Sequence, residues 1–136
     1  MATRSQAREV ALQVLFGDDM NPRANPAVAD QMIAERLVDG PVVEFARELV
    51  AGVRRNRAEI DQAIATAAAN WSLDRMAATD RAVLRIGTYE ILYAETPTPT
   101  PVAIDEAIEL AKRFGTKQSA QFVNGVLDAL VQSNKK

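Results

Sequence analysis

The sequence predicts an all-α fold, a compact bundle of about seven helices in a single domain spanning residues 1–136. Alanine is abundant, whereas glycine and proline occur only six times each, so few positions interrupt a helix. No stretch shows the sustained apolar and polar alternation that is typical of a half-buried strand. Apolar residues make up 48% of the chain, which supplies enough aliphatic side chains for one core.

Start and stop signals divide the chain into helical segments. With approximate bounds, these segments are residues 3–16, 26–38, 41–56, 57–70, 79–95, 101–114 and 117–132. We expect Gly17 to end the first segment and Thr116 to cap the last. Residues 71–76 read as an irregular connector that places Trp71 and Leu73 in the core. Whether the third and fourth segments form one bent helix or two stays open.

Two glycines, Gly87 and Gly125, lie inside predicted helices. A glycine in a helix interior costs up to ~1 kcal/mol relative to alanine. We expect a close helix–helix approach at both positions to offset that cost.

The composition argues against an enzyme or a metal protein. The chain has neither cysteine nor histidine, so it lacks thiol chemistry, the commonest general base and the commonest zinc ligand. Asp105 and Glu109 share one helix face, but Glu109 also reaches Arg113, and such a pair is common on surfaces. We therefore predict no catalytic residues and no metal.

Charge and hydropathy indicate a cytoplasmic protein. The formal net charge is −2, so a nucleic-acid site would have to come from local clusters of basic residues. Arg8 and Glu9 interrupt the pattern of a signal peptide. No apolar run approaches the ~20 residues that span a membrane.

One predicted helix carries a stripe of basic and aromatic residues at four-residue spacing: Arg81, Arg85, Tyr89 and Tyr93. Guanidinium groups pair with phosphates and rings stack on bases, so the stripe suits single-stranded nucleic acid. A protein-binding surface uses the same residue types. Packing of half-buried tyrosines explains the pattern equally well, and the residues alone leave these alternatives open.

Three basic clusters are further candidates. Arg4 and Arg8 share a face of the first helix and form either a phosphate clamp or a solvated first turn. The Arg54–Arg57 cluster is best explained as the favourable positive end of the third helix. The turn Phe114–Phe122 combines Lys117 with two aromatic rings beside a new helix N-terminus, which favours anions; the alternative is a plain helical hairpin with both rings in the core.

Beyond these patterns, three stretches resemble the NusB family: Arg4–Phe16, Asn70–Tyr93 and Pro101–Leu130. They occur in the family's order and cover well over half of the chain. The segments VAIDEAIELAKRFG and FVNGVL are the most specific. The resemblance implies an all-α transcription antitermination factor without catalysis or cofactor. Such a factor binds boxA-type single-stranded RNA in nascent ribosomal RNA transcripts as a heterodimer with NusE, a small-subunit ribosomal protein, and reaches RNA polymerase through other Nus factors.

The resemblance also implies site residues. For RNA, the matching positions are Arg4, Ser5, Arg8, Phe114, Thr116, Lys117, Gln118 and Phe122. For the protein partner, they are Asp80, Arg81, Leu84, Arg85 and Tyr89. Because the N-terminus has only two arginines where some members have more, we expect the Phe114–Phe122 turn to carry more of the RNA contact. The alternative function is a homo-oligomeric helical interaction protein of the same fold whose RNA binding is weak or masked.

Overall fold

A computed structural model describes residues 2–134, and within them the chain is entirely helical and irregular, without a strand. This part of the chain contains seven α-helices, one 3₁₀ turn between the fourth and fifth helices, and one π-helical turn between the fifth and sixth. The prediction of an all-α fold with about seven helices is therefore confirmed. The chain forms two compact units, Met1–Ala51 and Gly52–Lys136. The single-domain expectation stays a prediction.

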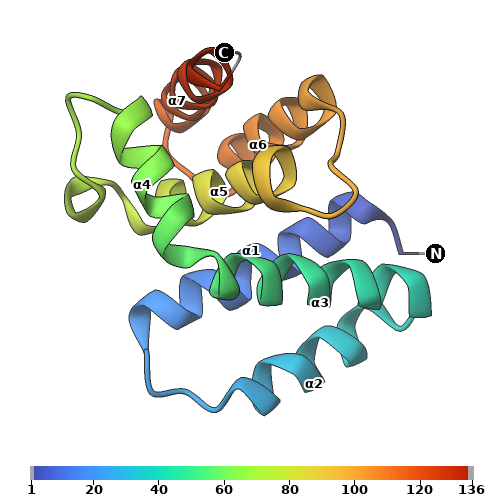
Figure 1. The fold of residues 1–136 in the computed structure, drawn as a ribbon. Helices are drawn as coiled ribbons and strands as arrows, with labels where there is room; N and C mark the ends of the chain where they lie inside the picture. The colour runs from blue at the N-terminus through green and yellow to red at the C-terminus, as the bar shows by residue number, and fades with distance from the viewer. Residues whose placement is uncertain (1, 135–136) are drawn as a thin grey trace. The chain divides into compact units, whose positions relative to one another are not determined.

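The N-terminal unit contains α1 (Arg4–Met20), α2 (Pro26–Leu37) and most of α3 (Gly40–Arg55) (Figure 1). α1 begins at Arg4 because Thr3 and Gln6 form a reciprocal capping box, in which each side chain accepts a hydrogen bond from the other residue's backbone N–H. α2 begins behind Asn25, whose side-chain oxygen accepts the N–H of Ala27 at 3.0 Å. Both caps hold amphipathic helices whose apolar faces pack against each other.

α1 continues three residues beyond Gly17, so the predicted end at that glycine is wrong. A terminal glycine stops a helix by adopting positive φ, and no glycine of the described residues does so. Gly17 keeps helical geometry, and its carbonyl accepts the N–H of Asn21 at 2.8 Å. The helix therefore ends at Met20, before a short turn.

The C-terminal unit begins with the end of α3, which is followed by α4 (Arg57–Ala67), η1 (Leu73–Arg75) and α5 (Ala78–Thr88). η2 (Tyr89–Tyr93), α6 (Thr100–Phe114) and α7 (Ser119–Ser133) complete it. α3 and α4 are separate helices. They are separated at Asn56, whose backbone N–H and side-chain amide both donate to the carbonyl of Gly52, at 3.0 and 2.8 Å.

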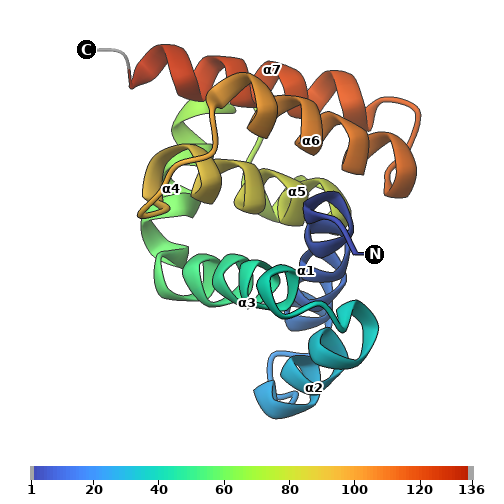
Figure 2. The same ribbon diagram turned by 90° about the vertical axis from the view of Figure 1, so that its right-hand side faces the viewer.

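α5 is the central helix of this unit. Every residue from Ala82 to Glu90 is buried, and α5 packs against α4, α6 and α7. α6 and α7 run antiparallel, side by side, beside it (Figure 2). The predicted straight helix to residue 95 is interrupted, because Tyr89–Tyr93 forms a π turn in which Ala94 donates to the carbonyl of Tyr89 at 2.9 Å.

The two helix-interior glycines differ. A Cβ at Gly87 would lie 3.1 Å from Leu127 Cδ1 and 3.7 Å from Ala107 Cβ, so the predicted close approach of helices is confirmed there. A Cβ at Gly125 would meet nothing within 4 Å, and Gly125 is exposed. The expectation of close packing at Gly125 is wrong, because that position faces away from its neighbouring helices.

Candidate nucleic-acid interface

The N-terminal candidates lie on the first two turns of α1. Arg4 and Ser5 are exposed, whereas Arg8 is only 3% exposed. The guanidinium carbons of Arg4 and Arg8 lie 4.5 and 5.1 Å from the centroid of the Phe45 ring. Cation–π attraction to one ring therefore holds both cations together. Arg4 carries its positive charge at the solvent-exposed start of α1, whereas Arg8 is buried against the same Phe45 ring.

The second group of candidates lies in the α6–α7 turn, which Gly115 makes tight. A Cβ on Gly115 would lie 2.4 Å from Ser119 Oγ and 2.8 Å from the carbonyl oxygen of Ala111. The N–H of Thr116 donates to buried Ser119 Oγ at 2.9 Å, and the N–H of Ser119 donates to the carbonyl of Thr116 at 3.1 Å. These bonds fix the turn and leave Thr116, Lys117 and Gln118 exposed. The helix begins at Ser119, so Thr116 is not the residue immediately before it.

The two phenylalanines that flank this turn have different environments. Phe114 is 38% exposed, and the Arg113 guanidinium lies 5.5 Å from its ring centroid. Phe122 is half-buried and contacts Trp71. The alternative in which both rings belong to the core does not hold for Phe114. Phe114, Arg113 and Lys117 therefore give the turn an exposed basic and aromatic surface, which is one of the two alternatives that the sequence left open.

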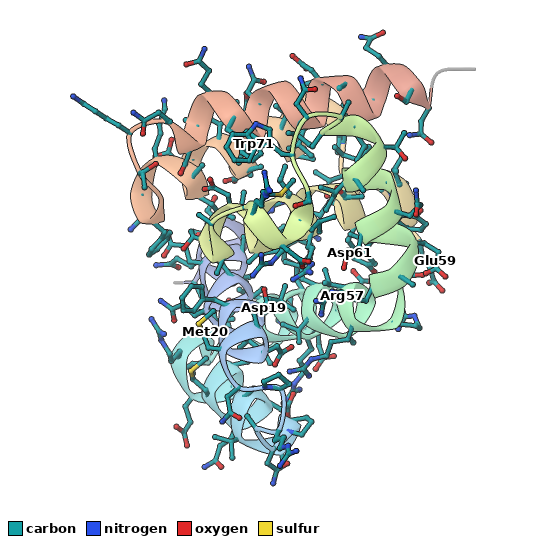
Figure 3. The ribbon with its side chains drawn as sticks, turned by 90° about the vertical axis from the view of Figure 1, so that its left-hand side faces the viewer. Asp19, Met20, Arg57, Glu59, Asp61 and Trp71 are labelled. Carbon is teal, nitrogen blue, oxygen red and sulfur yellow. The ribbon has the colours of Figure 1, made fainter. Side chains whose placement is uncertain are left out.

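Trp71 lies beside this surface instead of in the core. It is 52% exposed, so its predicted burial is wrong (Figure 3). Its ring meets Phe122 edge to face, with centroids 5.8 Å apart and planes at 70°. Trp71 stands between polar neighbours, Asn70 and Ser72, and this polarity is the sequence signal that could have indicated an exposed ring.

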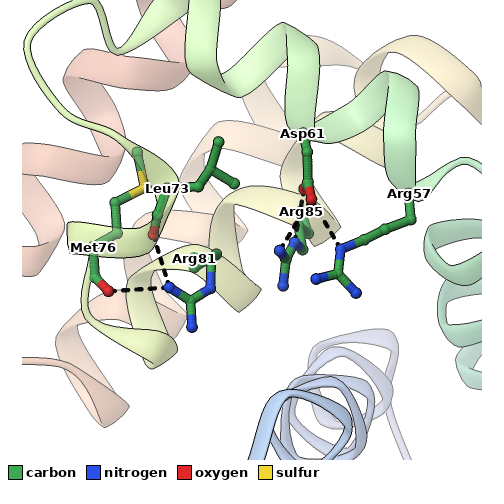
Figure 4. Close-up of polar contacts among 6 residues, drawn as sticks. All are labelled: Arg57, Asp61, Leu73, Met76, Arg81 and Arg85. Carbon is green, nitrogen blue, oxygen red and sulfur yellow. Dashed lines mark hydrogen bonds and ion pairs between the residues drawn. The ribbon is translucent and has the colours of Figure 1, made fainter. Parts of the chain in front are cut away.

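The connector that carries Trp71 is anchored by Arg81 on α5. Arg81 Nη1 donates to the carbonyls of Leu73 and Met76, at 2.7 and 3.3 Å (Figure 4). The Leu73 carbonyl also accepts the N–H of Met76 at 3.1 Å, so Arg81 ties η1 and the residue that follows it to α5. Arg81, expected at the partner surface, thus has a structural role in positioning the connector.

The other members of the predicted stripe on α5 are largely internal. Arg85 Nε and Nη2 donate to the two carboxylate oxygens of Asp61 at 2.8 and 3.1 Å, and Asp61 also accepts Arg57 Nε at 3.0 Å (Figure 4). Leu84 is completely buried, and Tyr89 is 1% exposed with its ring against Gly52. Packing therefore accounts for Arg85 and Tyr89. The π turn also moves Tyr93 off the regular four-residue stripe.

Asp80 lines a small pocket in this region. The pocket has a volume of about 260 Å³ and is lined by Trp71, Arg75, Met76, Ala77, Asp80, Gln118 and Phe122. Asp80 stands in the first turn of α5, where a carboxylate interacts favourably with the helix dipole. The pocket thus joins one expected partner residue to two expected RNA residues, Gln118 and Phe122.

Two searches of the described residues complete the description of possible sites. Residues 2–134 hold no group of three or more Asp or Glu side chains placed to share a metal ion. Among the helices of the same residues, none combines the length and the apolar character that a bilayer crossing requires.

Comparison with known proteins places this geometry in a family. The model of the NusB family matches residues 5–132. A transcription antitermination protein NusB of Bdellovibrio bacteriovorus is 41% identical over 128 residues, covering 94% of each chain. The corresponding protein of Kineococcus radiotolerans is 44% identical over 132 residues, covering 97% of this chain and 95% of the relative.

Solved structures agree with the sequence relatives. The structure of T. maritima NusB is 37% identical, superposes with a TM-score of 0.86, and covers 100% of this chain and 96% of its own. A structure of the antitermination factors NusB and NusE in complex with double-stranded RNA contains a chain that is 27% identical, with a TM-score of 0.83 and 96% of both chains covered. The chain described here belongs to the NusB family.

Proposed function

We propose that this chain is a transcription antitermination factor that binds boxA-type RNA of nascent ribosomal RNA transcripts together with NusE. The observation that carries the proposal is full-length similarity to NusB proteins, one of which is solved in complex with NusE and RNA. The proposal assigns the chain no catalytic step, no cofactor and a place in the cytoplasm. Contact with RNA polymerase would be indirect, through other Nus factors.

The RNA would meet two surfaces, one in each compact unit. The first is the exposed start of α1, where Arg4 and Ser5 are exposed and Arg8 supports Arg4 through Phe45. The second is the α6–α7 turn, with Phe114, Thr116, Lys117 and Gln118 exposed and Phe122 behind them. Positive side chains supply phosphate contacts, and rings supply stacking surfaces for unpaired bases.

The NusE surface would be sought near Asp80 and Arg81. Leu84, Arg85 and Tyr89 are buried, so they would act by holding α5 in place rather than by touching the partner directly. Their substitution is expected to change the stability of the fold before it changes partner affinity.

A binding titration tests the proposal. Labelled boxA-type RNA is titrated with the full chain at several salt concentrations, with and without NusE, and fluorescence anisotropy is recorded. We expect affinity to fall as salt rises and to increase when NusE is present. Absence of binding under every condition would contradict the proposal. A stable dimer by light scattering together with that absence would favour the alternative, a self-associating protein of this fold.

A further inference from the structure

An aromatic ring from α3 lies against the start of α1. Phe45 is half-buried, and it is not among the RNA residues that the family resemblance implies. Its ring centroid lies 4.5 Å from the guanidinium carbon of Arg4 and 5.1 Å from that of Arg8. All three residues belong to the N-terminal compact unit, so the whole cluster is contained in one body.

The two arginines of this cluster differ in their access to solvent. Arg4 is exposed, whereas Arg8 is only 3% exposed. A phosphate group of an RNA can therefore reach Arg4 directly, while almost all of the Arg8 side chain lies out of its reach. Arg8 contributes by packing against the Phe45 ring, and Arg4 offers the charge that an anion can meet.

Contact with the ring leaves Arg4 able to bind a phosphate. A guanidinium is planar, stacks on an aromatic ring through its flat face, and carries its N–H donors around its edge. Those edge donors match the oxygens of a phosphate, which often accepts two of them at once. The ring and the phosphate thus use different parts of Arg4, and both contacts can exist together.

The ring also lowers the entropic cost of the phosphate contact. An arginine has many rotamers, and fixing such a side chain on binding reduces affinity. Contact with Phe45 restricts Arg4 before any RNA arrives. The attraction between a cation and a ring at an exposed site corresponds to about a two- to fivefold change in an equilibrium constant. Loss of the ring should therefore weaken RNA binding by up to that factor.

We propose that Phe45 is a positioning residue of the RNA interface, whose ring holds the Arg4 guanidinium ready to pair with an RNA phosphate. Arg8, which the resemblance implies as an RNA residue, belongs to the support behind the ring. The inference rests on the proposed RNA-binding function and adds α3, which carries none of the implied RNA residues, to the parts of the chain that determine affinity.

The first experiment compares Phe45→Leu with Phe45→Tyr. Labelled boxA-type RNA is titrated with each full-length variant, with and without NusE, and anisotropy is recorded. Leucine keeps an apolar side chain but removes the ring, so we expect binding to weaken about two- to fivefold. Tyrosine keeps the ring, so its affinity should equal that of the unsubstituted chain. Equal affinity of Phe45→Leu and the unsubstituted chain would overturn the proposal.

The second experiment separates the charge distribution of the ring from its shape. Phe45 is replaced site-specifically by pentafluorophenylalanine, an aromatic residue whose fluorines withdraw electrons from the ring. The negative ring face that attracts a cation is thereby lost. We expect RNA binding to weaken as in Phe45→Leu. Unchanged affinity would show that position 45 only fills space and would overturn the positioning role.

A double-mutant cycle tests whether Phe45 acts through Arg4. In an Arg4→Ala chain, the further change Phe45→Leu should leave RNA affinity unchanged, because the ring has no exposed guanidinium left to hold. A two- to fivefold loss that persists in this background would mean that the RNA touches the ring itself, which overturns the proposal. The matched control is Phe16→Leu, which removes a partly exposed ring from the other end of α1 and should leave the affinity for RNA alone unchanged.

These outcomes keep the two proposals apart. If Phe45→Leu fails to fold by circular dichroism, the pentafluorophenylalanine chain decides the matter. If the unsubstituted chain binds RNA and every Phe45 variant binds equally well, the positioning role is overturned and the proposed function stands. If the unsubstituted chain binds no RNA at any salt concentration, with or without NusE, the proposed function itself fails.

Discussion

At the scale of single residues, Gly52 is a position of the C-terminal unit that leaves no room for a side chain. An added Cβ would lie 2.2 Å from two ring carbons of buried Tyr89. Gly52→Ala should therefore destabilise the protein by about 1–3 kcal/mol, the usual range for overpacking a filled core. Chemical denaturation measures this change as a lower midpoint.

Gly125→Ala is the matched control, since a Cβ there would meet nothing within 4 Å. It should stabilise the protein by up to ~1 kcal/mol, because alanine is the better helix former. Equal effects of the two substitutions would show that the Tyr89 contact is not what restricts position 52.

Asp61 is the second residue with a predictable energetic effect. It accepts two hydrogen bonds from Arg85, whose side chain is 5% exposed, while Asp61 is 27% exposed. Asp61→Ala should cost about 2–4 kcal/mol, somewhat less than breaking a fully buried pair, because solvent reaches the carboxylate. Thermal unfolding measures the loss.

Arg57→Ala serves as the control for Asp61. Arg57 pairs with the same carboxylate from an exposed position, and exposed pairs contribute at most ~1 kcal/mol. A loss for Arg57→Ala as large as that for Asp61→Ala would contradict the assignment of the energetic role to Arg85.

At the scale of elements, the α6–α7 turn links stability to the proposed RNA contact. Gly115→Ala would push a Cβ against Ser119 Oγ and the Ala111 carbonyl, so the turn must open. We expect a destabilisation of about 1–3 kcal/mol together with weaker RNA binding, because Lys117 and Gln118 lose their fixed positions. Denaturation and RNA anisotropy measure the two effects.

Gly17→Ala is the control for the turn, because its surroundings leave room for a Cβ and its φ is not positive. Its RNA affinity should equal that of the unsubstituted protein. Unchanged RNA affinity in Gly115→Ala, with the turn destabilised, would separate the turn from RNA binding.

The elements also show what periodicity can and cannot predict. Caps at Asn25 and the break around residues 96–99 follow from local chemistry, so those bounds were predictable. The predicted helix end at Gly17 was wrong because a glycine ends a helix by adopting positive φ, and tertiary packing decides whether it does so. The π turn at Tyr89–Tyr93 adds a residue to one helical turn without a proline or glycine in it, so no sequence signal marks it.

Side-chain exposure was less predictable than the helices. Tyrosine and arginine are common on binding surfaces. In this fold, however, the Tyr89 ring packs against Gly52 and Arg85 pairs with Asp61, so both side chains are buried. Tryptophan is a large apolar residue that is expected in a core, yet Trp71 lies on the connector and is half-exposed. Burial depends on which helices pack together, and a helical stripe alone does not contain that information.

At the scale of the whole molecule, the net charge of −2 makes RNA binding depend on local cations. Arg4→Ala and Lys117→Ala should each weaken RNA binding and reduce the slope of log affinity against log salt by about 1. Arg23→Ala is the control, an exposed arginine outside both proposed RNA surfaces. If all three substitutions reduce the slope equally, RNA binding reflects general charge and not the two surfaces.

Chemical-shift mapping of the full chain with boxA-type RNA, repeated with NusE present, tests the central claim most directly. We expect RNA-dependent shifts at Arg4, Ser5 and the exposed residues of the α6–α7 turn, Phe114, Thr116, Lys117 and Gln118, together with the single indole N–H of Trp71. Shifts from NusE should centre near Asp80 and Arg81. No RNA-dependent shift at these positions, with or without NusE, would contradict the account.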